Sequence, residues 1–281
     1  MEKNYLICDK VISIKSPRPI TEHENFKIFA TGGGSADIRI NYSIVEKLPA
    51  VPVSGTKSGN GTTVSFDGTT VCRNTPMGTA EGALSRYVVG DTSESNVFFT
   101  EGSYSTMSDF RYMWNSVSLS QLLLPFNVLL FHSSYIAVDG GAILFSGSCG
   151  VGKSTQAELW RKHKGAEVIN GDKAGVSVKD GEVYAHGLPF CGTSGICKNR
   201  TLPLKAIVLL SQSSENTVSR AVGVEAIQSL LKNIYLDFLV PGETQMCVDT
   251  LIQLLGTVPV YRLGCTPDER AVKTLATQLH I

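Results

Sequence analysis

The sequence has no net charge and no paired cysteine motif, and these absences exclude several classes of protein. Lys and Arg total 25, Asp and Glu total 25, and the formal charge is therefore zero. No long run of one sign breaks this balance, so the composition favours neither nucleic acid nor an anionic membrane as a partner. The seven cysteines are scattered without a C-x-x-C pair, which predicts free thiols in a reducing compartment and no zinc site.

Long apolar segments are also missing. The longest, residues 122–131, is too short to span a bilayer and contains Pro125. The opening residues Met-Glu-Lys-Asn lack the charged and apolar regions of a signal peptide, so we expect a soluble cytoplasmic protein. A hydrophobic fraction of 42% is nevertheless enough for a real core, and 281 residues suffice for one large domain or two small ones.

One segment carries a specific chemical signal. Residues 147–155 read Gly-Ser-Cys-Gly-Val-Gly-Lys-Ser-Thr and match G-x-x-x-x-G-K-[ST], the Walker A or P-loop motif. The glycines allow tight turns that bring backbone N–H groups close to a phosphate, Lys153 reaches the terminal phosphates, and the Ser154 hydroxyl can ligate Mg²⁺. We therefore predict a site for a nucleoside phosphate and Mg²⁺ formed by Gly147, Ser148, Cys149, Gly150, Val151, Gly152, Lys153, Ser154 and Thr155.

The flanks of this motif have the context that a P-loop requires. Residues 142–145 are a short apolar run typical of a buried strand, and residues 155–164 have the composition of a helix. The helix is expected to begin at about Lys153 and to direct the positive end of its dipole at the anion. A strand, a glycine-rich loop and a helix in this order indicate nucleotide binding, in preference to an ordinary Gly/Ser turn.

The chain before this motif is predicted to be rich in β-structure. Short apolar or alternating runs, one of them at residues 26–29, are separated by turn signals at residues 58–61 and at Asp67-Gly68. Residues 116–132 then read as a buried helix bent at Pro125. We place the domain junction there and predict a β-rich domain over 1–115 and a nucleotide-binding domain over 116–281.

The second domain is predicted to be α/β with a mixed sheet, because hairpins are interspersed with helices. Helices are expected over 225–239 and 243–255, separated by the breaker Pro241-Gly242, and from Pro267 onward. Strands are expected at the remaining apolar runs, which are 135–138, 142–145, 167–169, 175–179, 182–185, 204–210 and 258–263.

Several polar residues near the predicted site are candidates for chemistry. Asp172 follows the first strand after the loop helix, where P-loop proteins commonly carry a metal-binding carboxylate, so Ser154 and Asp172 are the predicted metal ligands. His132, just before the hairpin that leads into the loop, is either a core histidine with a structural role or a candidate catalytic residue beside Asp172 and Lys153. For His186 a structural role is favoured, and Lys198 and Arg200 lie either in a loop that brings cations to phosphate or in a solvated loop.

Together these positions resemble the catalytic domain of bacterial HPr kinase/phosphorylase, whose nucleotide fold is shared with phosphoenolpyruvate carboxykinase. The resemblance covers about residues 125–281: the run 131–154, which passes through two strands into the loop; the Asp-bearing turn at Gly171-Asp172; and the ending at 258–263. It implies a P-loop phosphotransferase with Gly147 to Thr155 at the ATP phosphates, His132 as active-site histidine and Asp172 as metal ligand.

The sequence departs from this family at its acidic positions. The family has an Asp-Asp pair where Gly171-Asp172 stands here; if the Gly-Asp-Asp motif of phosphoenolpyruvate carboxykinase is followed instead, Lys173 replaces the second Asp. A further family glutamate falls at Tyr184. Two functions therefore remain open: an ATP- and Mg²⁺-dependent kinase that phosphorylates a hydroxyl of a protein, peptide or small molecule, or a non-catalytic nucleotide-binding module. The oligomeric state is left open as well.

Overall fold

The computed structural model describes residues 1–51, 53–59, 61–77 and 80–281, and its contacts divide the chain into two units. The first unit comprises Met1–Phe126 and Leu236–Cys247, and the second comprises Asn127–Tyr235 and Val248–Ile281. The predicted junction between residues 115 and 116 therefore differs from the observed division in two ways: the first unit extends to Phe126, and a distant segment of the chain returns to it. The predicted turn at 58–61 contains Asn60, which lies outside the described residues.

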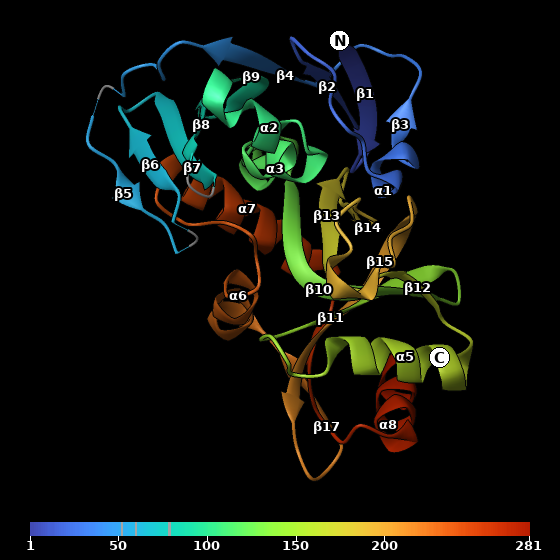
Figure 1. The fold of residues 1–281 in the computed structure, drawn as a ribbon. Helices are drawn as coiled ribbons and strands as arrows, with labels where there is room; N and C mark the ends of the chain where they lie inside the picture. The colour runs from blue at the N-terminus through green and yellow to red at the C-terminus, as the bar shows by residue number, and fades with distance from the viewer. Residues whose placement is uncertain (52, 60, 78–79) are drawn as a thin grey trace. The chain divides into compact units, whose positions relative to one another are not determined.

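The first unit is built on one large mixed sheet, drawn in blue and cyan in Figure 1. Its described strands follow the order β3-β1-β2-β4-β9-β8-β7-β6-β5. Strand β4 pairs in parallel with both β2 and β9, while the other neighbours are antiparallel. Their bounds are β1 Glu2–Ile7, β2 Lys10–Lys15, β3 Ala30–Thr31, β4 Ile38–Val45, β5 Thr56–Lys57, β6 Thr63–Phe66, β7 Thr70–Met77, β8 Ala80–Val88 and β9 Asp91–Thr100.

Short helices contribute an aromatic cluster to this unit. They are α1 Glu24–Lys27, η1 Glu101–Ser103, α2 Tyr104–Met107, α3 Phe110–Asn115, α4 Leu119–Leu123 and η2 Leu124–Phe126. The rings of Phe26 and Trp114 stack with centroids 5.4 Å apart, and Tyr5 meets Trp114 edge-on at 6.0 Å. The predicted strand at 26–29 is wrong, because Phe26 joins this cluster from a helical turn and not from the sheet.

The returning segment is held in the first unit by a buried arginine. The Arg73 side chain is only 2% exposed; it donates to Glu243 at 2.9 Å and to the Tyr87 hydroxyl at 2.8 Å, and it also pairs with Asp237. Without these two carboxylates the buried guanidinium would have no compensating charge, so these contacts fix the segment in the first unit. Its helix, α7, spans Pro241–Thr257 and thus continues into the second unit.

The second unit contains the predicted P-loop and is also organised around a mixed sheet. The described strands follow the order β11-β10-β13-β14-β15-β17-β16; β12 pairs with β10, and β11 pairs in parallel with β15. Their bounds are β10 Val128–Val138, β11 Gly141–Ser146, β12 Glu167–Asn170, β13 Lys173–Lys179, β14 Glu182–His186, β15 Thr201–Gln212, β16 Thr217–Ala221 and β17 Val260–Cys265. An α/β chain with large mixed sheets is therefore confirmed.

Two helices cover the core of this unit. Helix α5, Lys153–Lys164, and helix α8, Glu269–Leu279, contact each other and lie side by side in Figure 1. Trp160 of α5 is fully buried against Phe145 of β11, with ring centroids 6.2 Å apart. Asp268 caps α8 by accepting the backbone N–H of Arg270 at 2.9 Å. The other helices are α6 Gly223–Leu231, η3 Gly192–Ser194 and the second half of α7.

Three predicted helical segments need correction. Residues 128–132 belong to β10, because a continuously buried apolar run looks the same in a core strand and a core helix. Helix α6 ends at Leu231, and Asn233 and Tyr235 instead pair their backbones with His132 and Leu130. Pro241 begins α7 and does not break a helix, since proline at the first helical position has no N–H bond to lose.

The predicted hairpins are present, including those at Asp67-Gly68, between β10 and β11, and between β13 and β14. Within the described ranges, no helix combines the length and the apolar composition that crossing a membrane would require.

Candidate functional site

The P-loop segment connects β11 to α5, as its flanking sequence predicts. Gly147, Gly150 and Gly152 have φ values of 147°, 77° and 114°, which lie in the region that favours glycine. Gly152 is also the N-cap residue of α5 and accepts the backbone N–H of Gln156 at 2.9 Å. The loop thus has a backbone that only glycine adopts easily, and it ends at the positive end of a twelve-residue helix.

Lys153 folds its side chain back over this loop. Its ammonium group donates to the carbonyl oxygens of Gly147 and Ser148, both at 3.0 Å, and the residue is 8% exposed. Burial lowers the pKa of Lys153, while Cys149 and Asp172 act in the opposite direction. A cation held at a loop mouth by two neutral carbonyls can exchange those partners for phosphate oxygens, to which it binds more strongly because they are charged.

His132 and Asp172 come together beside this cation. His132 lies in the middle of β10, where the partner of that strand changes from β13 to β11 and β12. Its Nε2 is 3.7 Å from Oδ1 of Asp172. Burial and then the charge of Lys153 lower the pKa of His132, and Asp172 opposes them. The lowered pKa favours the neutral imidazole, which is the form that can accept a proton.

The position of Asp172 is determined by a buried asparagine that the sequence pattern did not single out. Asn170 is fully buried at the end of β12; its Nδ2 donates to the carbonyls of Leu188 and Phe190, at 2.9 and 3.0 Å. Its Oδ1 accepts the backbone N–H groups of Asp172 and Lys173, both at 2.9 Å. Asparagine before a Gly-Asp turn is a local signal for this arrangement, in which the side chain bridges the turn.

The structure also explains why position 171 carries no acid. A Cβ atom on Gly171 would lie 2.3 Å from Oγ of Ser194, so the neighbouring loop occupies the space of a side chain. Lys173, the next residue but one, places its ammonium 4.4 Å from the ring centre of Tyr235 and 5.4 Å from that of Phe190. Burial lowers the pKa of Lys173, and Asp172 partly offsets this effect.

Two clefts flank the phosphate loop. One has a volume of about 420 Å³, lies beside the start of α5, and is lined by residues that include Gly152, Thr155, Gln156 and Thr266. The other has a volume of about 220 Å³ and lies next to Gly147. The first volume is within the range of small-molecule sites, and the second suits only part of a ligand. Ser154 and Thr155 are exposed at the start of α5.

The remaining sequence candidates are engaged in structural contacts. His186 is 1% exposed and bonds Ser177 Oγ at 2.7 Å and Thr201 Oγ1 at 3.0 Å, in agreement with the favoured structural role. Lys198 pairs with Glu167 at 2.7 Å, and Arg200 pairs with the same carboxylate. Glu167 of β12 therefore binds both cations, and neither is engaged at the phosphate loop.

No cluster of three or more His, Cys, Asp or Glu side chains suited to a metal ion occurs among the described residues. A magnesium ion in a nucleotide site usually takes one or two protein ligands and fills its octahedron with phosphate oxygens and water. Ser154 and Asp172 would be those two ligands.

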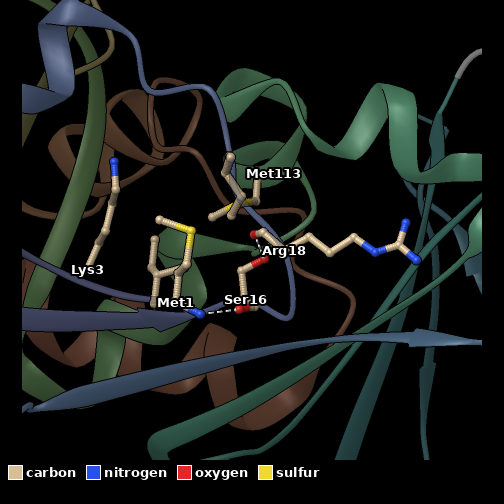
Figure 2. A pocket seen from close by; sticks show the side chains of 7 residues that line it. Met1, Lys3, Ser16, Arg18 and Met113 are labelled. Atoms are coloured by element: carbon tan, nitrogen blue, oxygen red, sulfur yellow. Dashed lines mark hydrogen bonds between the residues drawn. The ribbon is translucent and has the colours of Figure 1, made fainter.

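A smaller pocket in the first unit has no comparable chemistry. It is lined by Met1, Lys3, Ile14, Ser16, Arg18, Ile20 and Met113, and Figure 2 shows the N-terminal amine donating to Ser16 at its edge. Its volume is only about 10 Å³, too small for more than a water molecule, and its two cationic side chains pair with carboxylates, Lys3 with Glu22 at 2.8 Å and Arg18 with Glu101 at 2.6 Å. The candidate site is therefore the one around the loop in the second unit.

Comparisons with known proteins provide little further support. No protein-family model and no curated protein sequence matches the chain. A distant structural similarity exists to the solved structure of the Hpr(Ser) kinase/phosphatase from Coxiella burnetii: it covers 54% of this chain and 95% of that chain, with 10% sequence identity and a TM-score of 0.32. A similarity at this level carries no argument about function, which therefore has to be inferred from the residues of the site and their geometry.

Proposed function

We propose that the protein is a kinase that uses ATP and Mg²⁺ to phosphorylate a hydroxyl group. The observation that carries this proposal is the placement of His132 and Asp172, 3.7 Å apart, beside a Walker A loop whose three glycines have positive φ. A loop that only binds nucleotide needs no titratable pair at its mouth, whereas phosphoryl transfer needs a group that positions and deprotonates the acceptor.

The proposed reaction assigns one role each to Lys153, Ser154 and His132 and two roles to Asp172. The backbone N–H groups of 147–155 and the ammonium of Lys153 would bind the β- and γ-phosphates. The acceptor hydroxyl would give its proton to Nε2 of His132 as its oxygen forms a bond to the γ-phosphorus and the bond to the β-phosphate oxygen breaks. ADP would leave, and Asp172 would stabilise the resulting imidazolium by its negative charge.

Mg²⁺, held by Ser154 and Asp172, would supply neutralisation of the negative charge that the transferring phosphoryl group carries. The cleft beside Gly152 and Thr155 would hold the nucleoside. It lies at the end of the loop where the chain continues into α5, and its volume is sufficient.

One observation favours the second candidate function, a nucleotide-binding module without catalysis. Ser194 fills the space at Gly171, so the site holds a single carboxylate where the resembling family has two. Such a module would bind Mg·ATP with normal affinity and would release no phosphate over long incubation.

The experiment that tests the proposal compares two lysines of one helix. Lys153→Ala removes the loop cation, and Lys162→Ala removes an exposed cation from the far end of α5 as a matched control. For ATP at a hundredfold excess over its Kd, we expect about 2.7 kcal/mol of stabilisation in the wild type and the control, and its loss in Lys153→Ala. Equal stabilisation of all three proteins would refute the assignment of the loop. Binding without turnover in the wild type would favour the non-catalytic module.

A further inference from the structure

The cleft next to Gly147 is bordered by the phosphate loop and by a residue that pairs with the backbone of His132. A Cβ atom at Gly147 would come within 3.3 Å of the Leu210 carbonyl oxygen, and Leu210 lines the same cleft. On the other side, the cleft is lined by Asn233, whose carbonyl accepts the backbone N–H of His132 at 2.7 Å. A molecule in this cleft would therefore reach both the loop and the strand that carries His132.

The lining of this cleft is cationic. It contains Lys232 and Arg262, hydroxyls of Ser211 and Ser229, and no carboxylate among its described residues. Lys232 lies at the end of α6 and has no ion-pair partner in the described part of the chain. The Ser229 hydroxyl already donates to the Glu225 carbonyl at 2.8 Å, so the cations and the Ser211 hydroxyl are the groups that could bind an anion such as a carboxylate.

Arg262 is held in place for such a contact. Its guanidinium donates to Ser229 Oγ at 3.2 Å and pairs with Glu225 at 2.8 Å. Glu225 is 70% exposed, so its charge is screened by water and offsets only part of the positive charge. Since a guanidinium has five N–H donors, these two contacts leave others available to a ligand.

We propose that this cleft binds a carboxylate next to the hydroxyl that is phosphorylated, so that the acceptor is an anionic molecule. This inference rests on the proposed kinase function and names the class of acceptor. A serine flanked by acidic residues in a peptide and a small hydroxy acid share this chemistry. The nucleotide would have less need of these cations, because in the proposed function the loop amides and Lys153 bind its phosphates.

Matched acceptors test the proposal on the full chain with Mg·ATP. One pair consists of pentapeptides in which serine is flanked by two aspartates or by two asparagines, and the other pair consists of glycerate and glycerol. We expect kcat/KM to be at least about tenfold higher for the carboxylate member of one pair, equivalent to about 1.4 kcal/mol. The pair that shows this preference identifies the source of the carboxylate. Equal kcat/KM within both pairs would overturn the proposal and leave the kinase function intact.

Variants of the cleft provide the second part of the test. In Lys232→Gln and Arg262→Gln, KM for the preferred acceptor should rise about tenfold with little change in KM for ATP. Arg262→Lys should retain part of the preference, and Lys179→Gln, which alters an exposed lysine of β13, should match the wild type. A rise in the KM for ATP instead would show that these cations bind the nucleotide, and would overturn the proposal.

Binding separates this proposal from the kinase function. If no acceptor is phosphorylated, fluorescence anisotropy of the labelled aspartate and asparagine peptides is measured with the protein saturated by Mg·ADP. Preferential binding of the aspartate peptide that is lost in Arg262→Gln would uphold the carboxylate site and refute the kinase. Absence of any preference would refute the carboxylate site as well.

Discussion

Replacing Asn170 by aspartate is a sensitive test of how the site is built. The two side chains have nearly the same shape, but the substitution exchanges the Nδ2 donor for an oxygen. That oxygen would face the carbonyls of Leu188 and Phe190, which now accept hydrogen bonds at 2.9 and 3.0 Å. The other two bonds, from the N–H groups of Asp172 and Lys173 to Oδ1, would remain.

The magnitude follows from the two lost bonds. Each buried group left without a partner costs about 1–3 kcal/mol, and some of these contacts are only partly buried, so we expect about 2–4 kcal/mol of lost unfolding free energy. The repulsion between the introduced carboxylate and two carbonyls raises its folded-state pKa above the unfolded value. The folded protein thus favours the protonated form of the introduced carboxyl. The loss of unfolding free energy relative to wild type should therefore become smaller as pH falls.

The assay is urea unfolding of the full chain at two pH values, with Asn216→Asp as the matched control. Asn216 also accepts a backbone N–H through Oδ1, from Thr266 at 3.0 Å, but its Nδ2 donates to the Thr266 hydroxyl at 2.7 Å, and a hydroxyl, unlike a carbonyl, can rotate to donate instead. The control should therefore lose less than about 1 kcal/mol. If Asn170→Asp were as stable as this control, the buried asparagine would not fix the turn that carries Asp172.

Three further predictions concern the loop and the catalytic pair. Cys149 is exposed in the loop, so saturating Mg·ATP should protect it from alkylation, as followed by mass spectrometry; unchanged labelling would place the nucleotide elsewhere. NMR titration of the free protein should give a His132 pKa below about 6.5, raised in Lys153→Met and lowered further in Asp172→Asn, because the two charges act with opposite signs. Shifts of the same sign in both variants would contradict this arrangement. Asp172→Asn should slow phosphate transfer by about two to four orders of magnitude with a much smaller loss of ATP affinity, and wild-type rates would remove Asp172 from the metal site.

The sequence predicted best those features that depend only on residues close together in the chain. The Walker A segment predicts its own strand, loop and helix, since glycine spacing and backbone conformation are linked within a few residues. The order of the chain around 131–172 also indicates that His132 and Asp172 are close to the loop. In the structure, the pairing of β10 with β13 brings His132 opposite Lys173 and so places His132 next to Asp172.

Features that depend on distant contacts could not be predicted in this way. Residues 236–247 join the first unit because Asp237 and Glu243 form ion pairs with the buried Arg73. No local sequence pattern indicates that Arg73 is buried or that its partners lie so far along the chain. The cleft cations Lys232 and Arg262 are remote from the motif in sequence and come beside Gly147 only through the sheet order. The reason for a glycine at 171 lies in Ser194, which belongs to a separate loop.

The most direct test of the central claim is single-turnover transfer from ATP labelled in its γ-phosphate, with the protein in excess and the acceptor pairs present. We predict that the label passes to a hydroxyl acceptor in the wild type and in Lys162→Ala, and that transfer is lost in Lys153→Ala and strongly slowed in His132→Ala. Retention of all label in ATP by the wild type, at concentrations where calorimetry shows the site to be saturated with Mg·ATP, would contradict the proposed kinase.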